Sequence, residues 1–148
     1  MPIDALPAIE IRSGSMAHNT AILGDVVTSG REQGPDLTLE ASNGLLFADL
    51  TLNTQSGTSF VAAGLEQTFG DAWFIRPAVG LAIHDGKLDG QRNDLKLGSR
   101  VLIYARLDVG YDFGSWNFAF RAEHLSNGPF GGPNNGLDNY GIVIARAF

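Results

Sequence analysis

The chain has 148 residues, no cysteine and a net charge of -6 at pH 7. Its length suits one domain with a core of its own, and a hydrophobic content of 44% argues against general disorder. The acidic balance disfavours broad binding to nucleic acid, and the lack of cysteine excludes disulfides, thiolate metal sites and cysteine nucleophiles.

Apolar and polar residues alternate with period two along the chain, whereas helical periodicity is almost absent. In chain order, the alternating segments between turn signals predict eight strands: Ala8–Met16, Asp36–Ser42, Leu46–Asn53, Ser59–Phe69, Trp73–His84, Arg100–Phe113, Trp116–Ser126 and Asp138–Phe148. Eight antiparallel strands are enough to close a small barrel with a filled interior. We therefore predict an all-β fold, a single up-and-down antiparallel barrel that takes up residues 1–148.

The predicted connections differ in length between the two ends of the barrel. If the first strand runs outward, the long polar connections lie at one end: His18–Pro35, Asp85–Ser99 and Asn127–Leu137. Short turns, such as those at 70–72 and 114–115, join the strands elsewhere. Long loops at one end and short turns at the other are typical of outer-membrane barrels.

The long predicted strands have one apolar face and one face of small or charged residues. In WNFAFRAEHLS, Phe118 and Phe120 share the face opposite to Arg121 and Glu123. A soluble ligand-binding barrel turns the apolar face inward, whereas a membrane barrel turns it toward lipid and pairs the charges inside. The polar face carries both signs, which suits a narrow interior filled with ion pairs. Its charged residues include Glu10, Arg12, Glu66, Arg76, Arg106, Asp108, Arg121 and Glu123.

Aromatic residues near the strand ends of the apolar faces also favour the membrane barrel, because they form an interfacial girdle there. They are Trp73, Tyr111, Phe113, Trp116 and Phe148. The last predicted strand ends in Phe148, which resembles the assembly signal of bacterial outer-membrane proteins. Arg146 has the same apolar parity, so this interpretation requires its side chain to extend toward the membrane edge.

The first residues, MPIDALPAIEIR, have neither a basic n-region nor an apolar h-region, so they are not a signal peptide. Nor does any run approach the roughly 18 apolar residues of a spanning helix. The chain is therefore either cytosolic or a mature or recombinant form whose signal has been removed. The membrane barrel favours the second interpretation, with the bacterial outer membrane as its location.

A cluster of polar residues with catalytic chemistry occurs in FRAEHLSNGPFGGPNNGLDNY. His124 and Ser126 are two residues apart on a strand, so they point to the same face, and Asp138 has the parity of that face on the next strand. We expect Ser126 to lie opposite Asp138. Because ionisable residues that face lipid are costly, the cluster indicates either a serine nucleophile activated by a histidine and an acid or polar residues at the headgroup level.

The stretch RAEHLSNGPFGGPNNGLDNY resembles the signature of the lipid A 3-O-deacylase family of Gram-negative outer membranes, and the resemblance extends over roughly residues 73–148. It implies an eight-stranded barrel with a site on the outer wall, in which Ser126 is the nucleophile, His124 the general base and Asp138 the orienting acid. It also implies that Asn127 helps to bind the oxyanion, together with backbone N–H groups of the following loop.

Two residues depart from the family pattern. The usual acid is a glutamate, and Asp138 is one methylene shorter, so the last strand must lie closer or the contact must be looser. Pro129 has no N–H, so an oxyanion donor that the family places there must come from Gly128.

The resemblance predicts a serine esterase that removes the ester-linked 3-hydroxyacyl chain at the 3-position of lipid A, with no cofactor and no metal. Lipid A or lipopolysaccharide is then the substrate and outer-membrane lipids are the neighbours, while nucleic acid is no partner; the oligomeric state stays open, a homodimer included. The alternatives are a non-catalytic barrel with a structural or adhesive role, and a soluble barrel that binds a lipophilic ligand. His84 and Asp85 form a weaker candidate site, for a metal or a substrate.

Overall fold

A computed structural model of the protein describes residues 8–20, 32–88, 96–128 and 134–148. Its elements are β1 (Glu10–Ala17), β2 (Asp36–Ser42), β3 (Leu46–Asn53), β4 (Phe60–Glu66), β5 (Phe69–Gly70), β6 (Trp73–His84), β7 (Val101–Asp112), β8 (Trp116–Ser126) and β9 (Leu137–Ala147). Among the described residues, we find no helix with the length and apolar character needed to cross a membrane.

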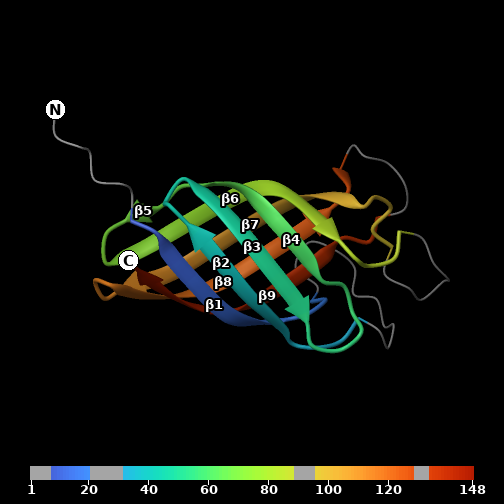
Figure 1. Ribbon diagram of the computed structural model, residues 1–148, viewed down its shortest axis with the longest axis horizontal. Coiled ribbons are helices and arrows are strands. Elements are labelled where there is room, and N and C mark those ends of the chain that lie inside the picture. Colours follow the sequence, from blue (N-terminus) through green and yellow to red (C-terminus); the bar gives the residue numbers. More distant parts are fainter. Residues whose placement is uncertain (1–7, 21–31, 89–95, 129–133) are drawn as a thin grey trace.

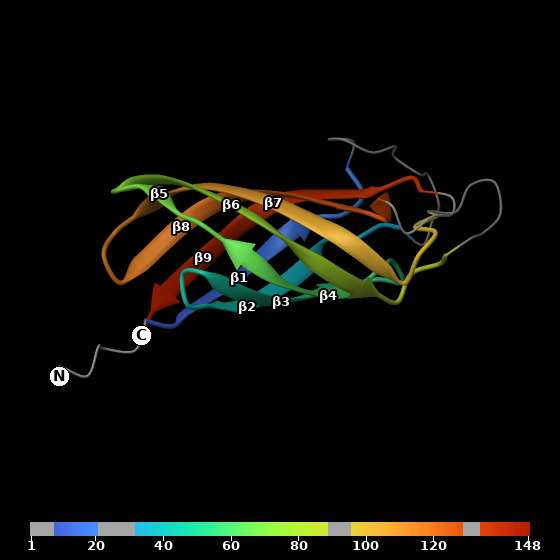
Figure 2. The ribbon, with the colours of Figure 1, turned by 90° about the horizontal axis from the view of Figure 1, so that it is seen from above.

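The strands form one closed antiparallel barrel. They follow the order β4-β3-β2-β1-β9-β8-β7-β6, and pairing of β4 with β6 closes the sheet on itself. The strands run obliquely to the long axis, with the C-terminus and the β2–β3 and β7–β8 turns at one end (Figures 1 and 2). The predicted eight-stranded up-and-down barrel is confirmed, with β4 and β5 together in place of the fourth predicted strand.

The interruption between β4 and β5 lies beside a proline. The Gln67 N–H donates to the carbonyl oxygen of Pro77 at 3.2 Å, but Pro77 has no N–H to donate in return. The ladder therefore stops, and the chain resumes pairing with β6 only at Phe69 and Gly70. Gly70 has φ = +102°, and a Cβ atom there would lie 2.2 Å from the carbonyl oxygen of Trp73, so this turn requires glycine.

Side chains alternate between an apolar outer wall and a polar interior. On β8, Phe118 and Phe120 are exposed, whereas Arg121 and Glu123 are buried. The same alternation runs along β6 and β7. The orientation predicted for a membrane barrel is therefore confirmed, and it is the opposite of what a soluble barrel with an apolar interior requires.

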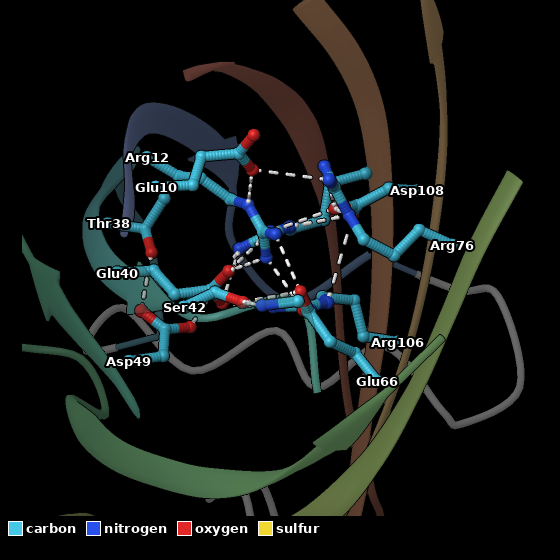
Figure 3. Close-up of polar contacts among 12 residues, drawn as sticks. Glu10, Arg12, Thr38, Glu40, Ser42, Asp49, Glu66, Arg76, Arg106 and Asp108 are labelled. Atoms are coloured by element: carbon cyan, nitrogen blue, oxygen red, sulfur yellow. Dashed lines mark hydrogen bonds and ion pairs between the residues drawn. The ribbon is translucent and has the colours of Figure 1, made fainter. Parts of the chain in front are cut away.

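Ion pairs fill the middle of the interior and connect strands on opposite sides of the barrel (Figure 3). Arg12 of β1 donates to both carboxylate oxygens of Glu66 on β4, at 2.6 and 2.7 Å. Arg106 of β7 contacts the same carboxylate and that of Glu40 on β2. Arg121 of β8 adds two hydrogen bonds to the carboxylate of Asp108, at 2.8 and 3.0 Å. Removing one member would leave buried charges with fewer partners than the intact network gives them, which is destabilising.

Aromatic side chains surround the end of the barrel where the short turns lie. The rings of Trp73 and Tyr111 are 5.0 Å apart between centroids. The guanidinium of Arg146 lies 5.3 Å from the ring centroid of Trp116 and 5.1 Å from that of Phe148. Arg146 is thus accommodated beside aromatic faces at the edge of the apolar wall, as the membrane barrel requires.

Candidate active site

The β8–β9 hairpin carries the three predicted site residues in a register that differs from the predicted one. His124 pairs with Asp138, and Trp116 pairs with Arg146. The expectation that Ser126 lies opposite Asp138 is therefore wrong by two residues. A shift of two residues leaves every side chain on its face, so the alternation on which the prediction rested fits both registers equally well.

The observed register brings the acid directly to the imidazole. Nδ1 of His124 lies 2.5 Å from Oδ1 of Asp138. The His124 side chain is 24% exposed on the outer wall, whereas the Asp138 side chain is fully buried beside it. A carboxylate in this position accepts a hydrogen bond from Nδ1–H, which keeps the proton on Nδ1 and leaves Nε2 as the basic nitrogen.

Ser126 is the last residue of β8 and lies on the same face as His124. It pairs with Ile103 of β7 and is half-buried. Within the described parts of the chain, its hydroxyl makes no hydrogen bond to His124. The structure thus brings the histidine and the acid into contact, and it places the serine two residues farther along the same strand face, toward the end with the long connections.

Asn127 and Gly128, the predicted oxyanion residues, follow directly after Ser126. Asn127 is buried. Gly128 has φ = +48°, and a Cβ atom there would lie 2.5 Å from Cδ1 of Ile103. The left-handed backbone favours glycine at this position. Pro129, whose missing N–H entered the sequence argument, lies outside the described residues.

The segment that follows β1 also contacts the acid, which the sequence analysis did not predict. The backbone N–H of Thr20 donates to the carbonyl oxygen of Asp138 at 2.7 Å, and its hydroxyl donates to the same oxygen at 3.1 Å. The Asn19 N–H donates to Oδ1 of Asn139 at 2.9 Å. Only the polar character of these residues was visible in the sequence, and their partners are more than a hundred residues away.

The weaker candidate site, His84 with Asp85, forms hydrogen bonds with backbone atoms of nearby residues. Nε2 of His84 lies 2.6 Å from the carbonyl oxygen of Ser99, and Nδ1 accepts the N–H of Gly86 at 3.0 Å. Oδ1 of Asp85 accepts the N–H of Ser59 at 2.7 Å. Among the described residues, no group of three or more His, Asp or Glu side chains is arranged to hold a metal ion.

A closed antiparallel barrel with an apolar outer wall and an ion-paired interior defines the class of outer-membrane β-barrels. The fold is similar to the crystal structure of the outer membrane enzyme PagL, with a TM-score of 0.63 and 20% identity over 94% of this chain and 98% of that chain. A second similar structure is that of the Yersinia pestis outer membrane protein Ail in a phospholipid bilayer nanodisc, with a TM-score of 0.48 and 9% identity over 96% of this chain and 99% of that chain. No curated protein matches the chain in sequence.

The model of the family described as lipid A 3-O-deacylase (PagL) matches residues 14–147. The chain therefore belongs to this family, which confirms the resemblance found in the sequence. Together with the barrel, the family identifies the protein as a lipid A deacylase of the Gram-negative outer membrane.

Proposed function

We propose that the protein is a serine esterase that removes the ester-linked 3-hydroxyacyl chain at the 3-position of lipid A. Ser126 is the nucleophile, His124 the general base and Asp138 the acid that orients the imidazole. The observation that carries the proposal is the 2.5 Å contact between Nδ1 of His124 and Oδ1 of Asp138, on the same outward face as Ser126. Family membership supports lipid A as the substrate.

The proposed reaction begins when the Ser126 hydroxyl oxygen attacks the ester carbonyl and its proton passes to Nε2 of His124. Asp138 stabilises the imidazolium that forms. As the tetrahedral intermediate collapses, His124 gives the proton to the departing sugar oxygen, and the acyl group stays on Ser126. Water then attacks the acyl-enzyme with His124 again acting as base, which releases the 3-hydroxy fatty acid and restores the serine.

Backbone and side-chain donors beside the nucleophile would bind the oxyanion. The Gly128 N–H and the Asn127 side-chain amide are the proposed donors, because both residues follow Ser126 directly and Asn127 is held in a buried position. The distance between Ser126 and His124 is not an obstacle, since catalytic hydrogen bonds are often loose without substrate and tighten when it binds.

The position of the site on the outer wall suits a lipid substrate. An acyl chain of lipid A lies in the same apolar layer as the exposed side chains of β8 and β9, such as Phe120 and Ile142. The ester bond, at the boundary between chains and sugar, would meet Ser126 at the end of β8. The substrate therefore needs no passage through the ion-paired interior of the barrel.

The two alternative functions require other features of the barrel than those observed. A soluble lipophilic-ligand binder requires an apolar interior, whereas buried ion pairs such as Arg121–Asp108 occupy it. A non-catalytic structural or adhesive barrel gives no reason for a buried carboxylate to hold a histidine on the wall that faces lipid, where ionisable groups are costly.

The test is to replace the nucleophile and the base in the barrel reconstituted with lipid A. Ser126→Ala and His124→Asn should each lower the release of 3-hydroxy fatty acid, followed by mass spectrometry of lipid A, by several orders of magnitude. Ser115→Ala, in the turn at the other end of the barrel, is the matched control and should retain activity. A folded Ser126→Ala or His124→Asn variant with near-normal turnover would show that the assignment is wrong.

A further inference from the structure

Residues 18–20, which begin the long connection after β1, form hydrogen bonds to the proposed catalytic acid beyond the end of the β1–β9 pairing. Pairing of β1 with β9 ends at Ala17 and Tyr140. Beyond it, Thr20 gives two hydrogen bonds to the carbonyl oxygen of Asp138, from N at 2.7 Å and from Oγ1 at 3.1 Å. The peptide group of Asp138 is therefore held by Thr20, while its side chain holds His124.

Asn19 gives this segment an unusual backbone. Its φ is +56°, the only positive value among the described non-glycine residues. Asparagine is one of the few residues that adopt this left-handed conformation, and such a conformation persists only where the surroundings enforce it. Here the Asn19 N–H donates to Oδ1 of Asn139, the residue after Asp138, at 2.9 Å. The turn at Asn19 presents Thr20 to the Asp138 carbonyl.

His18 holds the other side of this turn. Its side chain is fully buried, with Nδ1 2.7 Å from Oδ2 of Asp36 and Nε2 2.6 Å from Oε2 of Glu32. Glu32 in turn accepts hydrogen bonds from the N–H and the hydroxyl of Thr58, at 3.1 and 2.8 Å. His18 thus connects the end of β1 to the start of β2 and to the β3–β4 connection.

The charge of His18 follows from these contacts. Asp36 and Glu32 are the charged groups that face it. Burial by itself disfavours the imidazolium, but hydrogen bonds to both carboxylates outweigh it and raise the pKa of His18 to about 9. With both ring nitrogens donating to carboxylates, His18 is an imidazolium at neutral pH.

We propose that His18, Asn19 and Thr20 form a positioning element for the proposed catalytic acid: the imidazolium, fixed between Asp36 and Glu32, holds the turn that fixes the backbone of Asp138. This inference rests on the proposed function. None of the three residues needs to touch the substrate. They act by keeping the Asp138 carboxylate in its contact with His124, where a misplacement of about 1 Å costs roughly 10²-fold in rate.

Two substitutions test this element in the full chain, folded in vesicles that contain lipid A. His18→Gln removes the charge, and we expect kcat at pH 7 to fall roughly 10- to 100-fold with KM unchanged. His84→Gln is the matched control, because His84 is also a buried histidine near the same end of the barrel but binds Ser99 and Gly86. It should keep the kcat of the wild type.

The pH profile separates positioning from a merely structural role. In the wild type, kcat should fall as the pH rises through about 9, the pKa of His18, toward the level of His18→Gln. The variant should lack this alkaline decline. A wild-type kcat in folded His18→Gln, or an equal loss in His84→Gln, would overturn the proposal.

If His18→Gln does not fold, two variants of Thr20 test the positioning element instead. Thr20→Val removes the hydroxyl donor to Asp138 and should lower kcat roughly 3- to 10-fold, and Thr20→Ser, which keeps that donor, should restore it. Equal kcat in the two variants would overturn the proposal. An active Ser126→Ala enzyme would instead refute the proposed function. An inactive Ser126→Ala with normal His18→Gln and Thr20→Val refutes the positioning element alone.

Discussion

Asp138→Asn is the sharpest test of the proposed acid, because the substitution keeps the size of the side chain and removes its charge. An amide can hold the imidazole in the wrong tautomer and cannot stabilise the imidazolium; in serine proteases the corresponding change costs about 10⁴ in kcat. A water molecule could replace part of the lost charge at an exposed site. Here the Asp138 side chain is fully buried against His124, so little replacement is available.

We therefore expect Asp138→Asn to lower kcat by roughly 10³- to 10⁴-fold, or about 4 to 5.5 kcal/mol of transition-state stabilisation. The assay is release of 3-hydroxy fatty acid from lipid A in mixed micelles under saturating substrate. Asp138→Glu is a second test of the proposed acid. Because Asp138 lies directly opposite His124, with 2.5 Å between Oδ1 and Nδ1, the extra methylene should crowd the imidazole and lower activity modestly. An Asp138→Asn enzyme as fast as the wild type would refute the role of this acid.

Further predictions concern the barrel. Phe120→Arg should destabilise it in bilayers by about 2–4 kcal/mol because this side chain faces lipid, whereas Ala119→Ser, inside the wall, should cost much less; equal urea midpoints would contradict the orientation. Arg121→Met should lower the free energy of unfolding by about 3 kcal/mol, since Asp108 loses its hydrogen bonds at 2.8 and 3.0 Å and keeps only the longer ones to Arg76 at 3.3 Å; urea titration in detergent measures this, and an unchanged midpoint would count against the network. The folded pKa of His18, about 9, exceeds its ordinary value of 6.5, so its stabilisation should be complete below pH 6.5 and lost as the pH rises through 9; midpoints that stay constant from pH 7 to 10 would contradict it.

Strand parity predicted the faces of the barrel because it depends on local order alone. Phe118, Phe120, Arg121 and Glu123 lie where alternation put them. Parity did not predict the register of β8 and β9, because a two-residue shift changes the pairing and no face. β9 begins at Leu137, one residue earlier than predicted, and its pairing with β8 is shifted by two residues from the predicted register.

The sequence pattern did not predict contacts between distant segments of the chain. His18 stood alone in a predicted loop, and nothing in its neighbours identified Asp36 and Glu32 as its partners. The Thr20–Asp138 contact joins residues 118 positions apart, and it forms only because β1 and β9 are neighbours in the closed barrel. By contrast, the break after β4 follows from Pro77. Its missing N–H was visible in the sequence and its neighbouring strand was predicted, whereas its pairing with Gln67 was not.

The charged inner face also bears on how the chain travels to its membrane. Cross-strand neighbours such as Arg76 and Asp108 of β6 and β7 lie away from lipid only when the barrel is complete. A lone hairpin in a bilayer would expose such charges, at about 2–4 kcal/mol for each arginine near mid-depth. We therefore expect none of the described strands to be stable by itself in a bilayer. Because pairing of β4 with β6 completes the barrel, we expect insertion and closure to be one cooperative event in which partly inserted forms are penalised.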